Sequence, residues 1–153
     1  MEILRREQYP EYEAFVSAHP RGEFMQSTLW QQVKDNWQWE AVVSRDEEGK
    51  IAGACGVLIR RMPVFGAAML YAPRGPVCDI HDRRVLADLQ AGIDALAKKH
   101  NAYIFKMDPD VAAGDEAFLR LANSMGFTRF YGPDGFETIQ ARFNYRLYLN
   151  GRG

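Results

Sequence analysis

One helical pattern, residues 82–100, constrains the fold of this chain more than any other feature of its sequence. Apolar residues recur in it every three or four positions, at Val85, Leu86, Leu89, Ile93, Leu96 and Ala97. Asp82 can cap the first turn, and the basic run 98–100 complements the helix dipole at the last turn. A strand-like run, 102–107, follows directly, so we expect it to pair in parallel with a strand that precedes the helix.

Three strand patterns precede this helix, at residues 40–44, 51–60 and 67–71. The first two flank a short charged connection in which Gly49 is available for positive φ, which indicates a hairpin. Consecutive strands with connections this short are antiparallel. The sheet is therefore predicted to be mixed, with antiparallel pairs before the helix and a parallel pair across it.

Two helices are expected nearer the N-terminus. The first begins at Pro10, a residue well suited to the first turn, and ends before Pro20. The second is short, with Ser27 as its cap and one apolar face. That face is formed by Trp30, Val33 and Trp37, and Lys34 lies one turn after Trp30, with its ammonium beside the indole.

The C-terminal part adds one helix and further strands. Residues 117–125 have helical spacing, with Gly126 positioned as the C-cap. In the final strand, 138–149, Phe143, Tyr145, Leu147 and Leu149 alternate with Arg142, Asn144, Arg146 and Tyr148. The whole order of elements is that of the GNAT-type acyltransferase fold, an α/β architecture with a central, mostly antiparallel mixed sheet flanked by helices. Fold alone does not give function.

Composition limits the class of protein. A chain of 153 residues has the size of one domain, and its net charge of −1 argues against a protein that binds nucleic acid over its whole surface. The two cysteines give no disulfide framework, and with the three histidines they form no zinc spacing. No stretch is apolar enough to span a membrane, and the N-terminus lacks the pattern of a signal peptide, which together favour the cytoplasm.

The strand-to-helix junction, Leu70 to Asp79, carries the sequence Pro73-Arg74-Gly75-Pro76. Two prolines predict a stiff, exposed corner, and a guanidinium held on it offers a planar fork for phosphate or carboxylate. The alternative is a purely structural corner with a solvated arginine. GNAT enzymes hold the pyrophosphate of CoA on backbone N–H groups at this junction, and two prolines there argue against ordinary CoA binding.

Several blocks of sequence together resemble one family. The blocks are Phe24-Met25-Gln26-Ser27 with Trp30 and Lys34-Asp35-Asn36-Trp37, then Tyr71-Ala72-Pro73-Arg74-Gly75-Pro76, Lys106-Met107-Asp108-Pro109, Gly126-Phe127 and Ile139-Gln140-Ala141-Arg142. In this order and spacing they resemble the N-terminal half of the Fem (FemABX-type) aminoacyltransferases of the peptidoglycan bridge. Each member of the family resembles a tandem pair of GNAT-like domains. The members transfer an amino acid from aminoacyl-tRNA to the stem peptide of lipid II or of its UDP-linked precursor.

The resemblance implies site residues. Lys34 and Arg142 match positions that contact the phosphates of the precursor, and Asp108 matches an acidic residue near the acceptor amine. Tyr71 and Arg74 belong to the signature loop. The remaining candidate substrate-binding residues are Asn36, Trp37 and Tyr145. Ala141 departs from the family, which usually has proline there. Two roles are open for Asp108. Its carboxylate could orient or deprotonate the amine, or it could be a structural aspartate in a turn.

The resemblance also implies that residues 1–153 form one GNAT-like domain, the N-terminal half of a longer two-domain protein. Such a half is expected to bind the precursor weakly and not to turn over. The resemblance implies no cofactor, since aminoacyl-tRNA is the donor substrate. The second domain would make most of the contacts with the tRNA. Peripheral contact of the protein with the inner face of the membrane is compatible with the resemblance. The alternatives are a CoA-dependent N-acyltransferase, a non-catalytic module for dimerisation or partner binding, and a thiol site built from Cys78 and His81.

Overall fold

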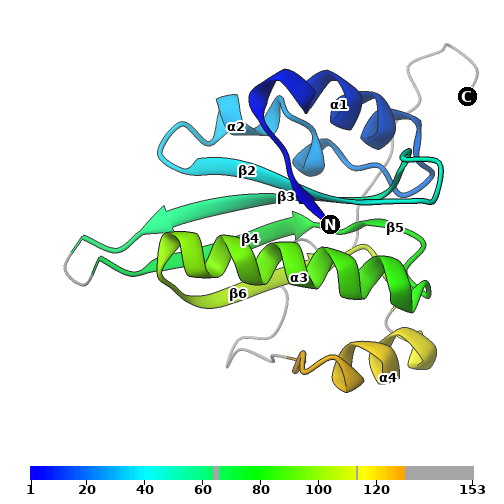
Figure 1. Ribbon diagram of the computed structural model, residues 1–153. Helices are drawn as coiled ribbons and strands as arrows, with labels where there is room; N and C mark the ends of the chain where they lie inside the picture. The colour runs from blue at the N-terminus through cyan, green and yellow to red at the C-terminus, as the bar shows by residue number, and fades with distance from the viewer. Residues whose placement is uncertain (64–65, 113, 130–153) are drawn as a thin grey trace, which may run out of the picture.

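The computed structural model describes residues 1–63, 66–112 and 114–129. These residues form a mixed sheet in the order β1-β2-β3-β4-β6, with β5 paired to β3 (Figure 1). The strands are β1 (Glu2–Ile3), β2 (Gln38–Arg45), β3 (Ile51–Arg61), β4 (Ala68–Arg74), β5 (Val77–Cys78) and β6 (Ala102–Pro109). The helices are α1 (Tyr9–Ala18), α2 (Trp30–Val33), α3 (Arg83–His100) and α4 (Glu116–Ser124), with 3-10 turns η1 (Arg6–Gln8) and η2 (Phe24–Gln26).

The sheet separates two layers of helix (Figure 1). On one face α1 packs its buried Tyr12 and Val16 against β2 and β3. On the other face α3 buries the predicted apolar stripe in the larger core cluster, to which α4 contributes Phe118. Burial of apolar surface on both faces is the main stabilising term for a sheet of this kind.

The prediction of a mixed sheet is confirmed. β2 and β3 pair antiparallel across the hairpin at Gly49, whose φ is 79°, and β3 and β4 are antiparallel as well. β4 and β6 are parallel, on either side of α3. Asp82 caps α3, because its carboxylate accepts the Val85 N–H at 3.0 Å. In the part of the chain that the structure describes, no helix has the length and apolar character needed to cross a bilayer.

Three local predictions were wrong. The third strand does not end at Tyr71 but continues as β4 through Pro73 and Arg74, because β6 offers it a parallel partner along its whole length. Ser27 does not cap α2; Leu29 stands at the cap, and the Ser27 hydroxyl accepts the Leu29 N–H at 3.1 Å. The helix ends at Val33, so Trp37 is not on its face. The predicted final strand, 138–149, lies outside the described residues.

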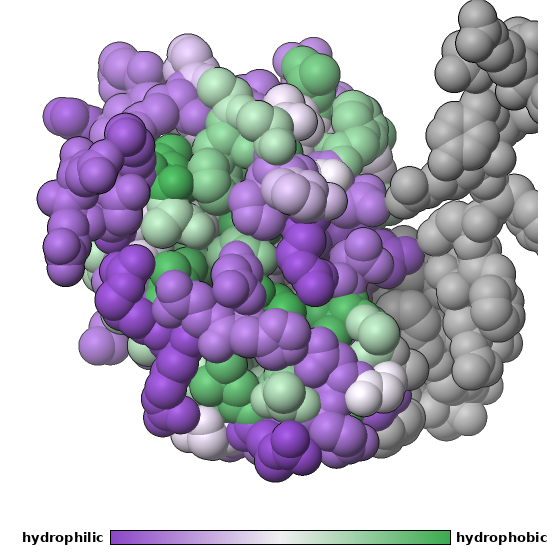
Figure 2. Space-filling view, turned by 90° about the vertical axis from the view of Figure 1, so that its right-hand side faces the viewer, coloured by the Kyte–Doolittle hydropathy of each residue, from purple (hydrophilic) through white to green (hydrophobic). Residues whose placement is uncertain are grey.

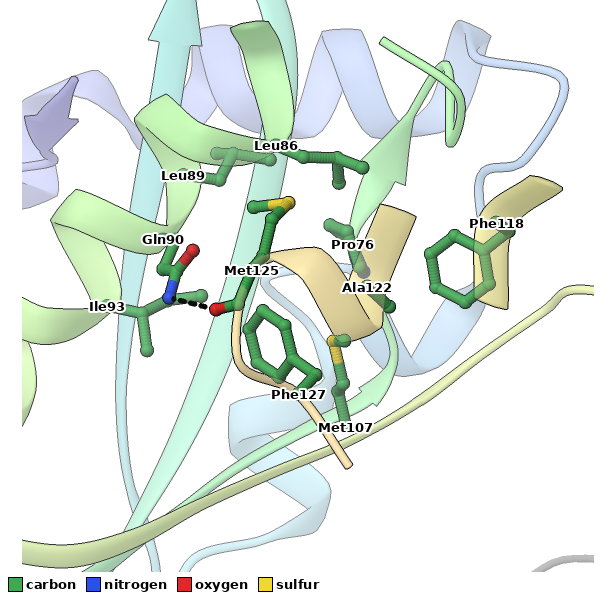
Figure 3. Close-up of a pocket in the computed structure, with 10 residues that line it drawn as sticks. All are labelled: Pro76, Leu86, Leu89, Gln90, Ile93, Met107, Phe118, Ala122, Met125 and Phe127. Atoms are coloured by element: carbon green, nitrogen blue, oxygen red, sulfur yellow. Dashed lines mark hydrogen bonds between the residues drawn. The ribbon is translucent and has the colours of Figure 1, made fainter. Parts of the chain in front are cut away.

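A small apolar cavity of about 20 Å³ lies where α4 approaches α3 and β6 (Figure 3). The Gln90 side chain donates to the Met125 carbonyl at 3.1 Å and ties the end of α4 to α3. The lining residues are Pro76, Leu86, Leu89, Gln90, Ile93, Met107, Phe118, Ala122, Met125 and Phe127. A void of this size admits at most about one water molecule, so it is a packing defect of the core rather than a ligand site.

Candidate functional site

The buried side chain of Gln26 joins three segments that are far apart in the sequence. Its Nε2 donates to the carbonyl of Gly56 at 3.1 Å and to that of Pro73 at 2.8 Å. Its Oε1 accepts the Gly56 N–H at 2.8 Å. An amide offers two donors and one acceptor oxygen, so both donors and the oxygen are in use. Gln26 therefore fixes residues 73–76, the end of β4 and the short connection to β5, to η2 and to the middle of β3. We call residues 73–76 the loop after β4.

Gly75 packs directly on this amide. A Cβ built at position 75 would stand 2.7 Å from the Cδ and Nε2 atoms of Gln26, closer than side-chain atoms approach each other. Arg74, the residue before it, has a φ of 55°, in the left-handed region that non-glycine residues rarely occupy. The segment from Pro73 to Pro76 is buried apart from Arg74, which is partly exposed. The prediction of an exposed corner was wrong, because η2 covers it.

Asp108 holds the other side of the same loop. It stands opposite Pro73 in the parallel β4–β6 register, and its Oδ1 accepts the Arg74 N–H at 3.0 Å. Its residue exposure is 8%. Burial raises the pKa of this carboxyl, although the Arg74 N–H, the Tyr71 side chain and the positive charge of Arg74 act to lower it. Oδ2 is buried and accepts no hydrogen bond of normal geometry from the described residues.

The loop has no backbone donors left for a pyrophosphate. Its two prolines carry no N–H group. The Arg74 N–H is used by Asp108, and the Gly75 N–H points to the Ala72 carbonyl at 3.4 Å. The pyrophosphate of CoA would need several free N–H groups at this place. The observed hydrogen bonds thus agree with the sequence argument against ordinary CoA binding.

A second group of candidate residues lies in the turn between α2 and β2. The Lys34 Nζ stands 5.5 Å from the Trp30 ring centroid, as the helical spacing predicted. Asn36 is exposed in the turn, which the Trp37 N–H closes on the Lys34 carbonyl at 2.9 Å. The Arg60 guanidinium lies over the Trp37 ring at 5.5 Å. Lys34 of the turn and Arg60 of β3 thus each lie over an indole.

The two groups stand at opposite ends of β4. Gln38, the first residue of β2, pairs with Ile59, which pairs with Leu70. Arg74 is four residues further along β4, about 13 Å at the rise of a strand. The turn at Lys34 precedes Gln38, so it lies further still from Arg74. The structure does not bring Lys34 and Asp108 together, and Arg142 and Tyr145 lie outside the described residues.

The surface at the end of β4 and β6 is chemically mixed. Figure 2 looks onto this end of the sheet and shows hydrophilic side chains interspersed with small hydrophobic groups. His81 lies here, and its Nε2 stands 2.9 Å from the carboxylate of Asp115, which also caps α4. This pair ties the loop after β5 to the start of α4, and it engages the His81 imidazole with a carboxylate instead of with the Cys78 thiol.

Cys78 is not an activated thiol. It is fully buried in β5, and burial, followed by the negative charge of Asp79, raises its pKa to about 12. Cys55 is buried as well, and burial raises its pKa. We expect neither cysteine to react with iodoacetamide at pH 7 in the native protein, and both to react in urea, as mass spectrometry would show. Rapid native labelling of Cys78 would restore the thiol hypothesis.

The raised pKa of Asp108 predicts a pH dependence of stability. Between its ordinary value of 3.8 and the higher native value, the folded state binds more protons than the unfolded state. Stability contributed by the protonated carboxyl is therefore present at low pH and is lost as pH rises through the native pKa. Urea melts at pH 3 to 8 give the free energies of unfolding of wild type and of Asp108→Asn. The stability of wild type relative to Asp108→Asn should increase as pH falls. A difference that shifts towards Asp108→Asn would mean that the native pKa is lowered.

Comparison with known proteins decides the family. The sequence model of the FemAB family matches residues 8–115, a range that holds η2, the Lys34 turn, the loop after β4 and Asp108. The chain belongs to the FemAB family. Among curated FemAB relatives, lipid II:glycine glycyltransferase of Staphylococcus haemolyticus is 36% identical over 120 residues, and that of Staphylococcus aureus is 34% identical over 122 residues. Each match covers 76% of this chain and 28% of the relative.

Solved structures agree with the FemAB assignment. The crystal structure of FemX superposes with a TM-score of 0.74 at 27% identity, over 84% of this chain and 32% of FemX. A ribosomal-protein-alanine N-acetyltransferase from Brucella melitensis gives a TM-score of 0.57 at 15% identity, over 86% of this chain and 93% of that protein. The second likeness shows the fold alone. The GNAT-like fold and the Fem resemblance predicted from the sequence are both confirmed.

Sequence reasoning missed Gln26 as a structural centre, and it missed Gly56 altogether. Gln26 lies in one of the blocks that resemble the family, but nothing in its neighbours predicts a buried amide. Its partners lie 30 and 47 residues further along the chain. The FemAB blocks are therefore related in space: Gln26 of the first block binds the loop of the second, and Asp108 of the third binds Arg74 in that loop.

Proposed function

We propose that this FemAB domain acts in the transfer of an amino acid from aminoacyl-tRNA to an amine on the stem peptide of a peptidoglycan precursor. In this proposal the chain is the half that binds the precursor, lipid II or UDP-MurNAc-pentapeptide. The observation that carries it is the convergence of three FemAB blocks on the loop after β4, through Gln26 and Asp108. The glycyltransferase relatives supply the reaction class.

The spacing of the two candidate groups suits a long acceptor. Lys34, with Arg142 and Tyr145 as further candidates, would bind the phosphates, with Asn36 and Trp37 in the same turn. Asp108 and Arg74 would meet the peptide at the other end of β4, and Tyr71 would contact it between the two groups. The distance of about 13 Å between Leu70 and Arg74 along the strand is a lower limit for the separation of the two groups, and the precursor offers an extended pentapeptide of up to about 17 Å in addition to its sugar and phosphates. In this proposal one precursor molecule contacts both groups.

In this proposal the carboxylate of Asp108 serves the amine. Its Oδ1 accepts the Arg74 N–H, and the Tyr71 side chain also acts on this carboxyl. A raised pKa makes this carboxylate a stronger proton acceptor than an ordinary aspartate. In the proposed step the amine gives a proton to the carboxylate, and its nitrogen forms a bond to the ester carbonyl carbon. The bond from that carbon to the tRNA ribose oxygen breaks, and the ribose oxygen takes the proton.

We assign the contacts with the donor, aminoacyl-tRNA, mainly to a second domain. The chain spans 28% of the length of the curated relatives that it matches. We propose that it is the N-terminal part of a two-domain enzyme of the cytoplasm, where aminoacyl-tRNA is available. A second domain would complete the acceptor cleft and contact the tRNA. The single domain is then expected to bind the precursor but not to turn over.

Calorimetry separates this proposal from CoA chemistry. We expect UDP-MurNAc-pentapeptide to bind the 153-residue chain weakly, with a Kd on the order of 0.1–1 mM, and acetyl-CoA to give no heat. Lys34→Ala should weaken precursor binding severalfold, whereas Lys50→Ala, an exposed lysine paired with Glu48, should not. Tight binding of acetyl-CoA would replace the proposal by the N-acyltransferase function. If neither UDP-MurNAc-pentapeptide nor acetyl-CoA gave a heat of binding, the result would favour a non-catalytic module.

A further inference from the structure

His100, the last residue of α3, is a histidine buried to an exposed fraction of 5%. Its two ring nitrogens face partners on two different strands. Nε2 stands 2.6 Å from Oε1 of Glu40 on β2, and Nδ1 stands 3.4 Å from Nη2 of Arg61, the last residue of β3. The imidazole therefore joins the end of α3 to both strands.

The two contacts define the protonation state of the ring. A guanidinium has only donors, so Nδ1 must be the acceptor of the hydrogen bond from Arg61. The single proton of the neutral imidazole is then on Nε2, from which it is donated to the Glu40 carboxylate. In this geometry His100 is a neutral ring that carries its proton on Nε2.

The charged groups beside the ring come from three elements. β2 contributes Glu40, β3 contributes Arg61, and the last turn of α3 contributes Lys98 and Lys99. The Lys99 Nζ lies 2.7 Å from Oε2, the second carboxylate oxygen of Glu40. The Glu40 carboxylate can therefore hold Lys99 and His100 together whether or not the imidazole is charged. Only the contact with Arg61 requires the neutral ring.

Arg61 and its neighbour Arg60 extend to opposite faces of the sheet, as successive side chains of a strand do. Arg61 meets His100 on the face that α3 covers, and the Arg60 guanidinium lies 5.5 Å from the Trp37 ring centroid on the α1 face. Both arginines are exposed. The Arg61 guanidinium can thus leave the imidazole for water without unpacking the core.

We propose that Glu40, His100 and Arg61 form a pH switch between the end of α3 and the end of β3. When Nδ1 takes a proton from solvent, it becomes a donor that faces another donor and a second positive charge. The Arg61 contact is then lost, while the hydrogen bond to Glu40 becomes an ion pair. Histidine is the side chain that ordinarily changes charge between pH 5 and 8. The switch uses none of the residues assigned to the precursor, so it stands independently of the proposed function.

Urea denaturation at pH 8 and pH 5 tests the switch with three variants. The Arg61 contact stabilises wild type only at the higher pH, so the folding equilibrium constant of wild type relative to Arg61→Met should be about threefold larger at pH 8 than at pH 5. Arg60→Met is the matched control on the other face, and its ratio to wild type should be the same at both pH values. In a His100→Gln background, the effect of Arg61→Met should no longer depend on pH.

Nitrogen-15 NMR of the wild-type side chains tests the switch without any substitution. We expect one proton on Nε2 of His100 at pH 8, protons on both ring nitrogens at pH 5, and a change in the Arg61 side-chain signals over the same pH range. Three results would overturn the proposal. These are a proton on Nδ1 at pH 8, a ring that stays neutral at pH 5, or the same ratio of wild type to Arg61→Met at both pH values.

Discussion

Gln26→Leu is expected to lower the free energy of unfolding by about 3–6 kcal/mol. Leucine is close to glutamine in volume, so the change removes hydrogen bonds and leaves little cavity. It would leave the Gly56 N–H, the Gly56 carbonyl and the Pro73 carbonyl buried without their partner. Each unsatisfied buried group costs about 1–3 kcal/mol, more than a hydrogen bond contributes when it is made.

Urea denaturation followed by tryptophan fluorescence would measure this loss. Gln32→Leu is the matched control, because Gln32 is exposed on α2 and the same substitution there should change stability by less than about 0.5 kcal/mol. A loss of under about 1 kcal/mol for Gln26→Leu would mean that water or a shifted loop satisfies these groups. The Gln26 bridge would then not be what holds the loop after β4.

Gly75→Ala is expected to be the second most damaging substitution, at about 2–4 kcal/mol. The new Cβ would meet the Gln26 amide at 2.7 Å, and that amide cannot move without giving up its bonds to Gly56 and Pro73. Gly114→Ala is the control, because a Cβ there meets nothing within 4 Å. It should be neutral within about 0.5 kcal/mol.

A double-mutant cycle tests the cause of the Gly75 effect. In a Gln26→Ala background the obstructing amide is gone, so Gly75→Ala should cost much less than in wild type. The interaction energy is expected to exceed about 1 kcal/mol, as for residues in direct contact. If the losses in free energy of unfolding were additive, the Gly75→Ala effect would come from the backbone of the loop and not from contact with Gln26.

Much of the fold could be predicted from the sequence because its signals are local. The stripe from Val85 to Ala97 and the cap at Asp82 depend on residues within a few turns of each other, and both were confirmed. The hairpin at Gly49 is a local signal of the same kind. β1 and β5 are two residues long each, too short for any periodicity, and they exist because β2 and β3 offer them partners.

The candidate site was less accessible to sequence reasoning, for a physical reason. The Lys34–Trp30 contact follows from helical spacing and was predicted. The burial of the loop around Gly75 was not, because the residue that covers it, Gln26, arrives from a segment with no pattern of its own. The Asp108 contact with Arg74 depends on the parallel register of β4 and β6, which no short-range signal specifies.

The two roles of Asp108 suggested by the sequence are compatible. The carboxylate is a structural residue, because its Oδ1 holds the left-handed Arg74 through the backbone N–H. This bond uses the backbone of Arg74, and among the described residues no hydrogen bond or ion pair holds its guanidinium, so we expect the side chain to serve a ligand role. Glycine adopts positive φ without strain, and Arg74→Gly is therefore the substitution that removes the guanidinium while sparing the turn.

The account depends most on the claim that the two ends of β4 form one acceptor site. Amide chemical-shift mapping of the ¹⁵N-labelled chain with UDP-MurNAc-pentapeptide tests it directly. We predict changes at both ends, at Lys34 and Asn36 in the turn before β2 and at Arg74 and Asp108 on β4 and β6, with the same apparent Kd. No shift at either end, or shifts at one end that leave the other unchanged at saturation, would contradict it.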